Sequence, residues 1–166
     1  MVEDLGFLMA EDTQDIQEIE APEGEPYLKF MLSNGTEVAL PALAVAEVMS
    51  VSADRITPMP NTNTTLLGTL NLRGDIIWVA DLGQFLGEGM PLNVDRVEVS
   101  VIAVKDDEDL VMGLAVDNIV GMEWLKSDRL IPARAEGLIR GEWHEGGKPL
   151  RLLDHIGVLR SHRWAG

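Results

Sequence analysis

The chain has 166 residues, of which 46% are hydrophobic and 25% are charged, a composition typical of one or two small globular domains. No apolar run approaches the roughly 20 residues of a membrane-spanning helix, and the N-terminus lacks the basic start of a signal peptide, so we expect a cytoplasmic protein with no membrane insertion. The absence of cysteine excludes disulfides and thiolate chemistry. A net charge of −15 argues against nucleic acid as a partner.

The first 26 residues carry nine acidic side chains and no Lys or Arg. We expect residues 1–26 to form a disordered acidic extension, because like charges repel one another and the segment ends with prolines and a glycine. An alternative interpretation is a short docking motif made of four apolar residues, which are Leu5, Phe7, Leu8 and Met9. The folded part is predicted to span residues 27–160, with a tail at residues 161–166.

The folded part opens with a predicted β-hairpin. Apolar runs at residues 27–32 and 38–40 flank an Asn-Gly pair, and these two residues tolerate the positive φ of a tight hairpin turn. Residues 42–48 fit a strand or one or two helical turns equally well, and both interpretations stay open.

Two more strands follow at residues 66–72 and 76–79, which are rich in Leu, Ile, Val and Trp. Asp81 comes directly after them. Its carboxylate is placed to accept the first free backbone N–H groups of a short helix that ends at Leu86.

A repeat then relates the two halves of the chain at an offset of about 74 residues. Residues 53–58 match residues 127–132, and residues 79–86 match residues 152–159 with an aspartate at the same place. The second half is therefore predicted to repeat the plan of the first, with strands at 97–104, 110–116, 138–143 and 150–153 and with Asp154 as the second helix cap.

Short strands separated by turns predict an all-β fold of barrels or sandwiches with short helical turns, and each half of the chain supplies one five-strand unit. We expect the first barrel at about residues 27–96 and the second at about residues 97–160. A unit of this size buries little apolar surface alone, so the two barrels should pack together.

Catalytic motifs are absent, and no cofactor is expected. The sequence has no phosphate-binding loop, no His-Glu-x-x-His and no Gly-x-Ser-x-Gly. One alternative is a small-molecule-binding or metal-dependent hydrolytic twin barrel with zinc held by Glu142, His144 and His155. These residues lack a recognisable ligand spacing, so no resident metal is predicted.

The acidic run Asp106–Asp109 lacks the glycine and the final glutamate of a calcium-binding EF-hand loop. It is interpreted as a hairpin tip that faces water.

Arg73 is the side chain that most favours a functional interpretation. Residues 27–125 hold five basic side chains, and Arg73 ends an apolar strand beside Gly74. A guanidinium suits a carboxylate at a protein interface, and Glu47 is a candidate for holding it in place beforehand. The alternative is an arginine that contacts only water.

The residues around Arg73 resemble a known family. The segments that carry the resemblance are Val45-Ala46-Glu47-Val48, Ile56-Thr57-Pro58-Met59-Pro60, Leu67-Gly68, Asn71-Leu72-Arg73-Gly74-Asp75-Ile76-Ile77, Val79-Ala80-Asp81-Leu82 and Met112-Gly113-Leu114-Ala115-Val116-Asp117. They are similar to the signature of CheW-like chemotaxis coupling proteins, and they cover most of residues 27–160. The resemblance implies two packed SH3-like barrels, which agrees with the repeat.

The resemblance also implies a function. CheW-like proteins are non-enzymatic adaptors that link the cytoplasmic tips of chemoreceptors to the regulatory domain of a CheA-type histidine kinase. It implies a receptor-binding groove between the barrels, made by Val45, Glu47, Asn71, Arg73 and Gly74, and kinase contacts at barrel ends and strand edges. A further alternative is a CheW-like regulatory domain that acts on a kinase without receptors.

Three features depart from the family pattern. Trp78 stands where a proline is usual, Gly83 replaces a polar or basic residue, and the acidic extension is long. Trp78 is interpreted as a core residue or as an interface anchor. These departures favour a specialised array for type IV pilus motility or phototaxis over flagellar control.

Overall fold

The structure is a computed structural model that describes residues 23–60, 64–88, 91–92, 97–133, 137–144 and 146–161. The expected disorder of residues 1–22 and the end of the expected tail lie outside the described residues.

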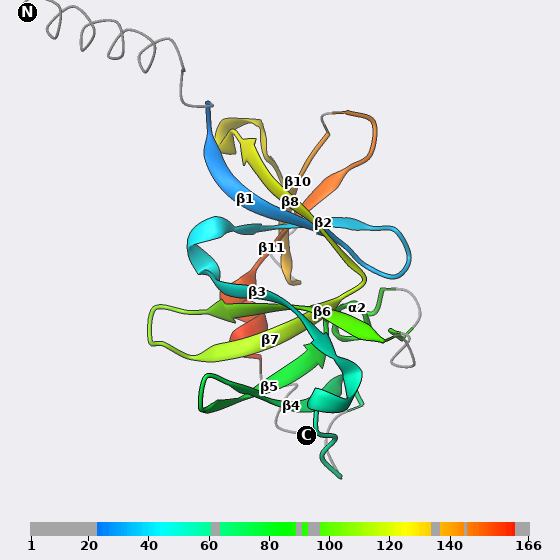
Figure 1. Cartoon of the computed structure of the whole chain (residues 1–166). Coiled ribbons are helices and arrows are strands. Elements are labelled where there is room, and N and C mark those ends of the chain that lie inside the picture. The colour runs from blue at the N-terminus through cyan, green and yellow to red at the C-terminus, as the bar shows by residue number, and fades with distance from the viewer. Residues whose placement is uncertain are drawn as a thin grey trace, which may run out of the picture.

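The described residues form two packed β-barrels with short helical turns, and the predicted fold class is thereby confirmed (Figure 1). Barrel A, the upper body in Figure 1, has the strand order β8-β1-β2-β11-β10-β9. Its strands are β1 (Glu25–Met31), β2 (Glu37–Pro41), β8 (Asn118–Leu125), β9 (Ile131–Pro132), β10 (Ile139–Trp143) and β11 (Leu150–Leu153).

Barrel B, the lower body, has the strand order β3-β6-β7-β5-β4. Its strands are β3 (Val45–Ser52), β4 (Leu66–Leu72), β5 (Asp75–Asp81), β6 (Glu98–Lys105) and β7 (Val111–Val116). The helical turns are η1 (Ala42–Ala44), η2 (Ala53–Arg55), η3 (Ser127–Arg129), α2 (Leu82–Phe85) and α3 (His155–Leu159).

The first hairpin and both helix caps are confirmed, but the turn with positive φ at both Asn34 and Gly35 is wrong, because of these two residues only Gly35, at 84°, has a positive φ. The first hairpin is β1–β2, and in its turn the Asn34 side-chain oxygen accepts a hydrogen bond from the Thr36 N–H at 3.0 Å. Asp81 caps α2 by accepting from the Gln84 N–H, and Asp154 caps α3 by accepting from the Gly157 N–H. The ambiguous segment 42–48 contains both predicted structures, because η1 comes first and β3 follows.

The barrels do not follow the expected boundary near residue 96, because the two halves exchange strands. The repeat relates β1–β5 to β6, β7, β8, β10 and β11. Barrel A combines the opening hairpin of the first half with four strands of the second half, and barrel B combines the opening hairpin of the second half with three strands of the first half. The two halves meet at two antiparallel pairs, β1 with β8 and β3 with β6, and at two parallel pairs, β5 with β7 and β11 with β2. A parallel pair needs a long connection that tight turns cannot supply.

The residue register follows the same symmetry. In barrel B, Val79 lies opposite Gly113, and in barrel A the equivalent Leu152 lies opposite Ala39. The exchange is therefore reciprocal.

Burial explains why the barrels stay together. The largest cluster of buried apolar residues lies between them and draws on β1 and β2 of barrel A and on β5, β6 and β7 of barrel B. Smaller clusters fill the interior of barrel B, around Val79 and Val101, and of barrel A, around Trp143 and Leu152. Strands of both barrels thus bury apolar side chains on two faces, and the expected packing of the two units is confirmed.

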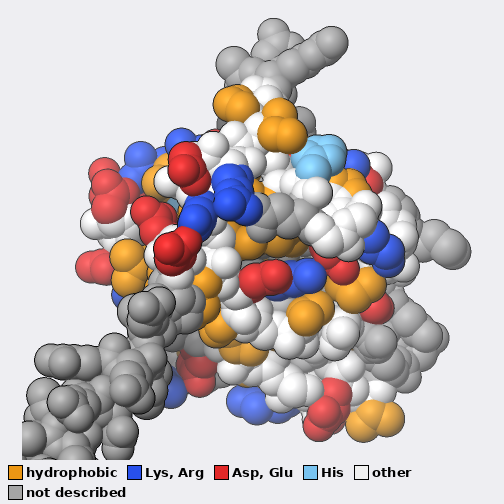
Figure 2. Space-filling view, turned by 90° about the horizontal axis from the view of Figure 1, so that it is seen from above, with side chains coloured by type: hydrophobic (Ala, Val, Ile, Leu, Met, Phe, Trp, Pro, Cys, Tyr) orange, Lys and Arg blue, Asp and Glu red, His pale blue; other side chains and the backbone are white. Residues whose placement is uncertain are grey.

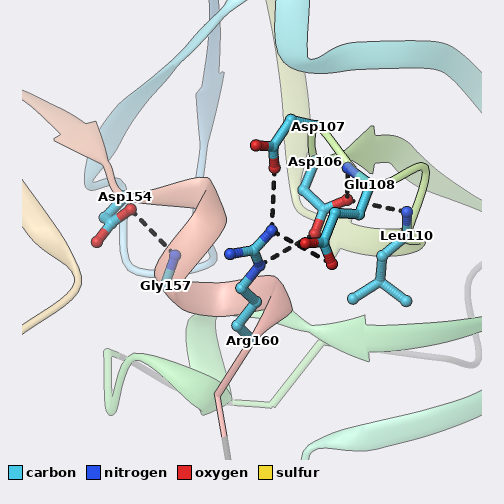
Figure 3. A network of polar contacts seen from close by, with 7 residues as sticks. All are labelled: Asp106, Asp107, Glu108, Leu110, Asp154, Gly157 and Arg160. Atoms are coloured by element: carbon cyan, nitrogen blue, oxygen red, sulfur yellow. Dashed lines mark hydrogen bonds and ion pairs between the residues drawn. The ribbon is translucent and has the colours of Figure 1, made fainter.

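The acidic run at the β6–β7 turn differs from its prediction at one residue. Asp106 is buried, and its carboxylate accepts hydrogen bonds from the backbone N–H groups of Glu108 and Leu110, both at 2.9 Å. Arg160, at the end of α3, reaches across to Asp106 at 3.2 Å and to Asp107 at 2.9 Å (Figure 3). The water-facing interpretation was wrong for Asp106, because a distant arginine compensates its burial.

Candidate functional site

The turn between β4 and β5 presents Arg73. Arg73 and Gly74 have φ values of 53° and 92°, and this pair of positive angles is typical of the type I′ turn that joins two strands through two residues. The Asn71 side-chain oxygen accepts a hydrogen bond from the Gly74 N–H at 2.8 Å. A left-handed conformation costs an arginine about 1 kcal/mol, so the hairpin and the Asn71 contact hold Arg73 in place against its own preference.

The Arg73 guanidinium forms the predicted ion pair with Glu47. Its Nη2 lies 3.2 Å from Glu47 Oε1, and the two side chains are 81% and 30% exposed. The pair joins the β4–β5 turn to β3, and β3 and β4 are the two edge strands of barrel B. An exposed ion pair contributes at most about 1 kcal/mol to stability, so its clearer effect is to orient a guanidinium that remains open to solvent.

Four of the five predicted groove residues, Glu47, Asn71, Arg73 and Gly74, thus meet at one corner of barrel B. Val45 lies at the start of β3, half-buried, and packs against the core between the barrels. The set therefore runs from the seam between the barrels to the exposed turn.

Apolar side chains lie beside this corner on the same hairpin. Ile76 and Trp78 of β5 are 66% and 40% exposed, and they stand opposite Asn71 and Thr69 of β4. Trp78 is thus only partly buried, and its exposed part is available to a partner.

Strand β8 carries exposed apolar residues that the sequence analysis missed. Val120, Met122 and Trp124 are 52%, 57% and 45% exposed and alternate along β8, the edge strand of barrel A. We call these three residues the β8 row. Two signals could have found β8: the period-two apolar pattern, and the position of the segment one repeat after β3.

The barrel ends differ in chemistry. A pocket of about 530 Å³ opens at the end of barrel B, and it is lined by Ala53, Asp54, Ile56, Pro58, Leu66, Leu67 and Val99. The equivalent end of barrel A has a pocket of about 390 Å³, lined by Glu23, Gly24, Glu25, Lys126, Ser127 and Asp128. The lining is mainly apolar in barrel B and mainly charged or polar in barrel A.

The residues of the zinc alternative do not form a metal site in this structure, and the Glu142 carboxylate contacts His144 and Arg151. Glu142 Oε2 lies 3.0 Å from His144 Nε2, and Glu142 Oε1 lies 3.4 Å from Arg151 Nε. Burial lowers the pKa of His155 below its usual range, with opposing contributions from nearby charges. Across the described ranges, no group of three His, Cys, Asp or Glu side chains is arranged to hold a metal ion.

The face of barrel A seen from above mixes charge of both signs. Figure 2 shows Lys and Arg side chains beside Asp and Glu side chains, with hydrophobic side chains between them. Elsewhere in barrel A, an ion pair joins Arg151 Nη1 of β11 to Glu88 Oε1 at 2.7 Å. Neighbouring opposite charges satisfy one another, so this face is not a strongly charged patch.

Two barrels with a shared core, an oriented exposed arginine and exposed apolar strand residues define a protein-docking module. A family model described as "CheW-like domain" matches residues 26–163, so the chain belongs to the CheW-like domain family. Proteins of this family are non-enzymatic scaffold or adaptor proteins, and the chain is therefore a CheW-type adaptor.

Two curated relatives carry chemotaxis names. The chain is 30% identical over 149 residues to "Chemotaxis protein CheW" of Klebsiella aerogenes, covering 86% of each chain. It is 30% identical over 82 residues to the protein of the same name from Thermotoga maritima, covering 49% of this chain and about half, 52%, of that relative.

A third relative bears a pilus name, and one solved structure shares the fold. The chain is 32% identical over 117 residues to "Protein PilI" of Pseudomonas aeruginosa, covering 63% of this chain and 64% of that protein. The scaffolding protein TtCheW from Thermoanaerobacter tengcongensis superimposes with a TM-score of 0.68 at 24% identity, over 78% of this chain and 88% of that one. Among the described residues, no helix has the length and apolar character needed to cross a membrane.

Proposed function

We propose that this chain is a cytoplasmic adaptor that couples methyl-accepting chemoreceptors to a CheA-type histidine kinase. Membership of the CheW-like family supports partnership with receptors and kinases in general. The observation that carries the proposal is the Arg73–Glu47 pair, which orients a solvent-exposed guanidinium beside exposed apolar residues.

The receptor tip is proposed to bind at the corner formed by Val45, Glu47, Asn71, Arg73 and Gly74. An apolar helical tip would pack against the seam of the barrels near Val45, and a carboxylate on the tip would take the free face of the guanidinium. Apolar contact would supply affinity, and the charge pair would set the register of the tip. Trp78 would act as an anchor at the margin of the contact, because large aromatic side chains contribute strongly to interfaces.

The kinase regulatory domain is proposed to bind at the open end of barrel B. The pocket there is mainly apolar, and Asp54 is the charged residue in its lining. An apolar side chain from the kinase would fill it, as anchor residues fill pockets at other interfaces. The charged end of barrel A offers no equivalent apolar pocket within the described residues.

We infer a pathway for type IV pilus motility or phototaxis. Similarity to the pilus-named relative supports the pilus assignment.

Pull-down of the full chain with a receptor signalling tip and with the kinase regulatory domain tests the proposal. Arg73→Glu should weaken receptor binding at least about tenfold and leave kinase binding unchanged, because the substitution reverses the charge at the corner alone. Lys148→Glu is the matched control, since it makes the same charge change at the exposed β10–β11 turn of barrel A. Equal receptor binding by wild type and Arg73→Glu would show that the corner is not the receptor site. Kinase modulation without any receptor binding would favour a receptor-independent regulatory domain instead.

A further inference from the structure

The β8 row is an apolar surface beside the point where the N-terminal segment joins the fold. β1 pairs with β8 so that Glu25 lies opposite Leu125 and Pro26 lies opposite Trp124. The chain before Glu25 therefore starts next to one end of the row. Met122 and Trp124 lie opposite Leu28 and Pro26, so they share the face of the sheet to which Leu28 of the core between the barrels belongs. Val120 lies at the register shift, where β8 has one extra residue.

Acidic residues of the N-terminal segment match basic residues at this end of β8. Lys126 Nζ lies 2.5 Å from Glu23 Oε2. The hydrogen bond and charge of Lys126 lower the pKa of Glu23, and the charge of Arg129 adds to this effect. Residues 1–22 carry seven further acidic side chains and no basic ones. The first described acidic residue of the segment thus already contacts the base that follows β8.

The sequence of the segment also supplies apolar side chains and enough length. Leu5, Phe7, Leu8 and Met9 form a cluster near its start, and 13 residues separate Met9 from Glu23. At about 3.3 Å per residue, an extended connection reaches roughly 45 Å. The β8 row spans only about 13 Å, so the cluster can reach every part of it.

We propose that this N-terminal apolar cluster covers the β8 row of its own chain. Packing of the cluster against Val120, Met122 and Trp124 would remove apolar surface from water, and the acidic residues around it would face Lys126 and Arg129. The contact is intramolecular and reversible, because a short apolar cluster joined to the fold by 13 residues gains a high effective concentration but little buried area. Any partner that uses the β8 row must then displace this segment. The inference does not depend on the proposed receptor and kinase contacts.

The absence of cysteine permits a clean experiment on the full chain. Ala10→Cys gives a single thiol for a nitroxide label next to the cluster. We expect amide signals of residues 118–125 to lose more than half their intensity relative to the reduced label, and signals of residues 66–81 to be far less affected. A second labelled chain, in which Leu5, Phe7, Leu8 and Met9 are replaced by Ser, keeps every acidic residue and should lose the effect.

Three results would overturn the inference. Equal broadening in the Ser-substituted chain would mean that charge alone holds the segment. Broadening in a mixture of labelled, isotope-free chains with unlabelled, isotope-enriched chains would mean that a second copy is the occupant. A weak effect spread evenly over both barrels would mean that the row has no occupant in the free protein. The exposed pair Met122→Ser and Trp124→Ser provides the reciprocal variant, which should abolish the effect without disturbing the core.

Discussion

Barrels A and B share strand order and register, yet they differ at equivalent surface positions. Barrel B exposes Trp78, and the equivalent residue of barrel A is Arg151, which is engaged by Glu88 and Glu142. Leu67 lines the apolar pocket of barrel B, and its equivalent in barrel A is the exposed Arg140. The repeat therefore preserves the strand pairing and the core of the two barrels. The side chains at exposed positions differ, and they determine what each barrel can bind.

The largest effect is expected at two equivalent glycines, where β4 of barrel B and β10 of barrel A each pass close to the backbone of another segment. Gly68 has φ 147°, and an added Cβ would overlap the Thr57 carbonyl oxygen. At the equivalent Gly141, a Cβ would lie 2.6 Å from the Ile131 carbonyl oxygen. We expect Gly68→Ala to lower the free energy of unfolding by about 3 kcal/mol or more, and Gly141→Ala by less, because only Gly68 combines strain with overlap.

Urea unfolding followed by circular dichroism measures both changes. Gly121→Ala is the control, since φ is 142° there but the space is open. If Gly121→Ala lowers the free energy of unfolding as much as Gly68→Ala does, backbone strain alone explains the loss of stability. The close approach of Gly68 to the Thr57 backbone would then contribute nothing.

The next prediction transfers one surface residue between the barrels. Leu67→Arg copies Arg140 into the barrel B pocket, and we expect binding of the kinase regulatory domain to fall at least about tenfold, or about 1.4 kcal/mol. Titration calorimetry with the isolated kinase domain measures the affinity. Arg140→Leu should leave it unchanged, and a loss of affinity in that variant alone would place the kinase contact on barrel A.

A smaller loss of stability is expected at two hairpin turns, each of which is contacted by a residue that follows a short helix. Arg160 contacts Asp106 near the β6–β7 turn, while Glu88 accepts a hydrogen bond from Asn34 in the β1–β2 turn at 3.0 Å. Arg160→Ala should lower the free energy of unfolding by less than Gly68→Ala does, because the Asp106 carboxylate loses part of its compensation while the arginine itself is half exposed. Asn34→Ala should cost less, because its contact is exposed.

The pH dependence of the unfolding free energy gives a second test of the Arg160–Asp106 contact. Burial favours the protonated form of Asp106, but two backbone N–H groups and Arg160 outweigh it and hold its pKa below the ordinary value of 3.8. Its stabilising contribution is therefore complete above that value and is lost as pH falls through the lowered pKa. Unfolding free energies of wild type and Arg160→Ala should converge in strong acid, and a constant difference at every pH would contradict the mechanism.

The smallest effect is expected at the Arg73–Glu47 pair. Glu47→Gln should change the unfolding free energy by less than about 1 kcal/mol, because exposed ion pairs are weak and are screened by salt. The same variant should weaken receptor-tip binding measurably if orientation of the guanidinium matters. A large loss of stability with unchanged receptor-tip binding would mean that the Arg73–Glu47 pair stabilises the fold and does not orient the guanidinium for a partner.

Much of the local structure was predictable because local residues determine it. The Asn34-Gly35 turn and the caps at Asp81 and Asp154 depend on groups within four residues along the chain. The strand exchange was not predictable, because apolar periodicity identifies a strand without identifying its distant neighbour. The burial of Asp106 was missed for the same reason, since Arg160 lies 54 residues away.

At the candidate site, the chemistry of the guanidinium and carboxylate groups predicted the pairing of Arg73 with Glu47, and the structure added the exposure of the arginine. The exposure of the β8 row was not predictable, because the apolar side chains of a strand are ordinarily expected to point into the core. On β8 the alternation places Val120 and Met122 outside while Glu123 is half-buried in a contact with Lys29. The exposure of these side chains depends on how much of β8 the other barrel covers. That is decided by the tertiary packing of the two barrels, which a local sequence pattern does not contain.

The exchange of strands between the halves also bears on how such a molecule arises. A half-length polypeptide would find the strands that complete its sheet only in another copy of itself, so an ancestral half would function as a swapped pair. Joining two copies into one gene removes the dependence on concentration. It also frees each half to mutate separately, and one outside face can then change while its counterpart is kept.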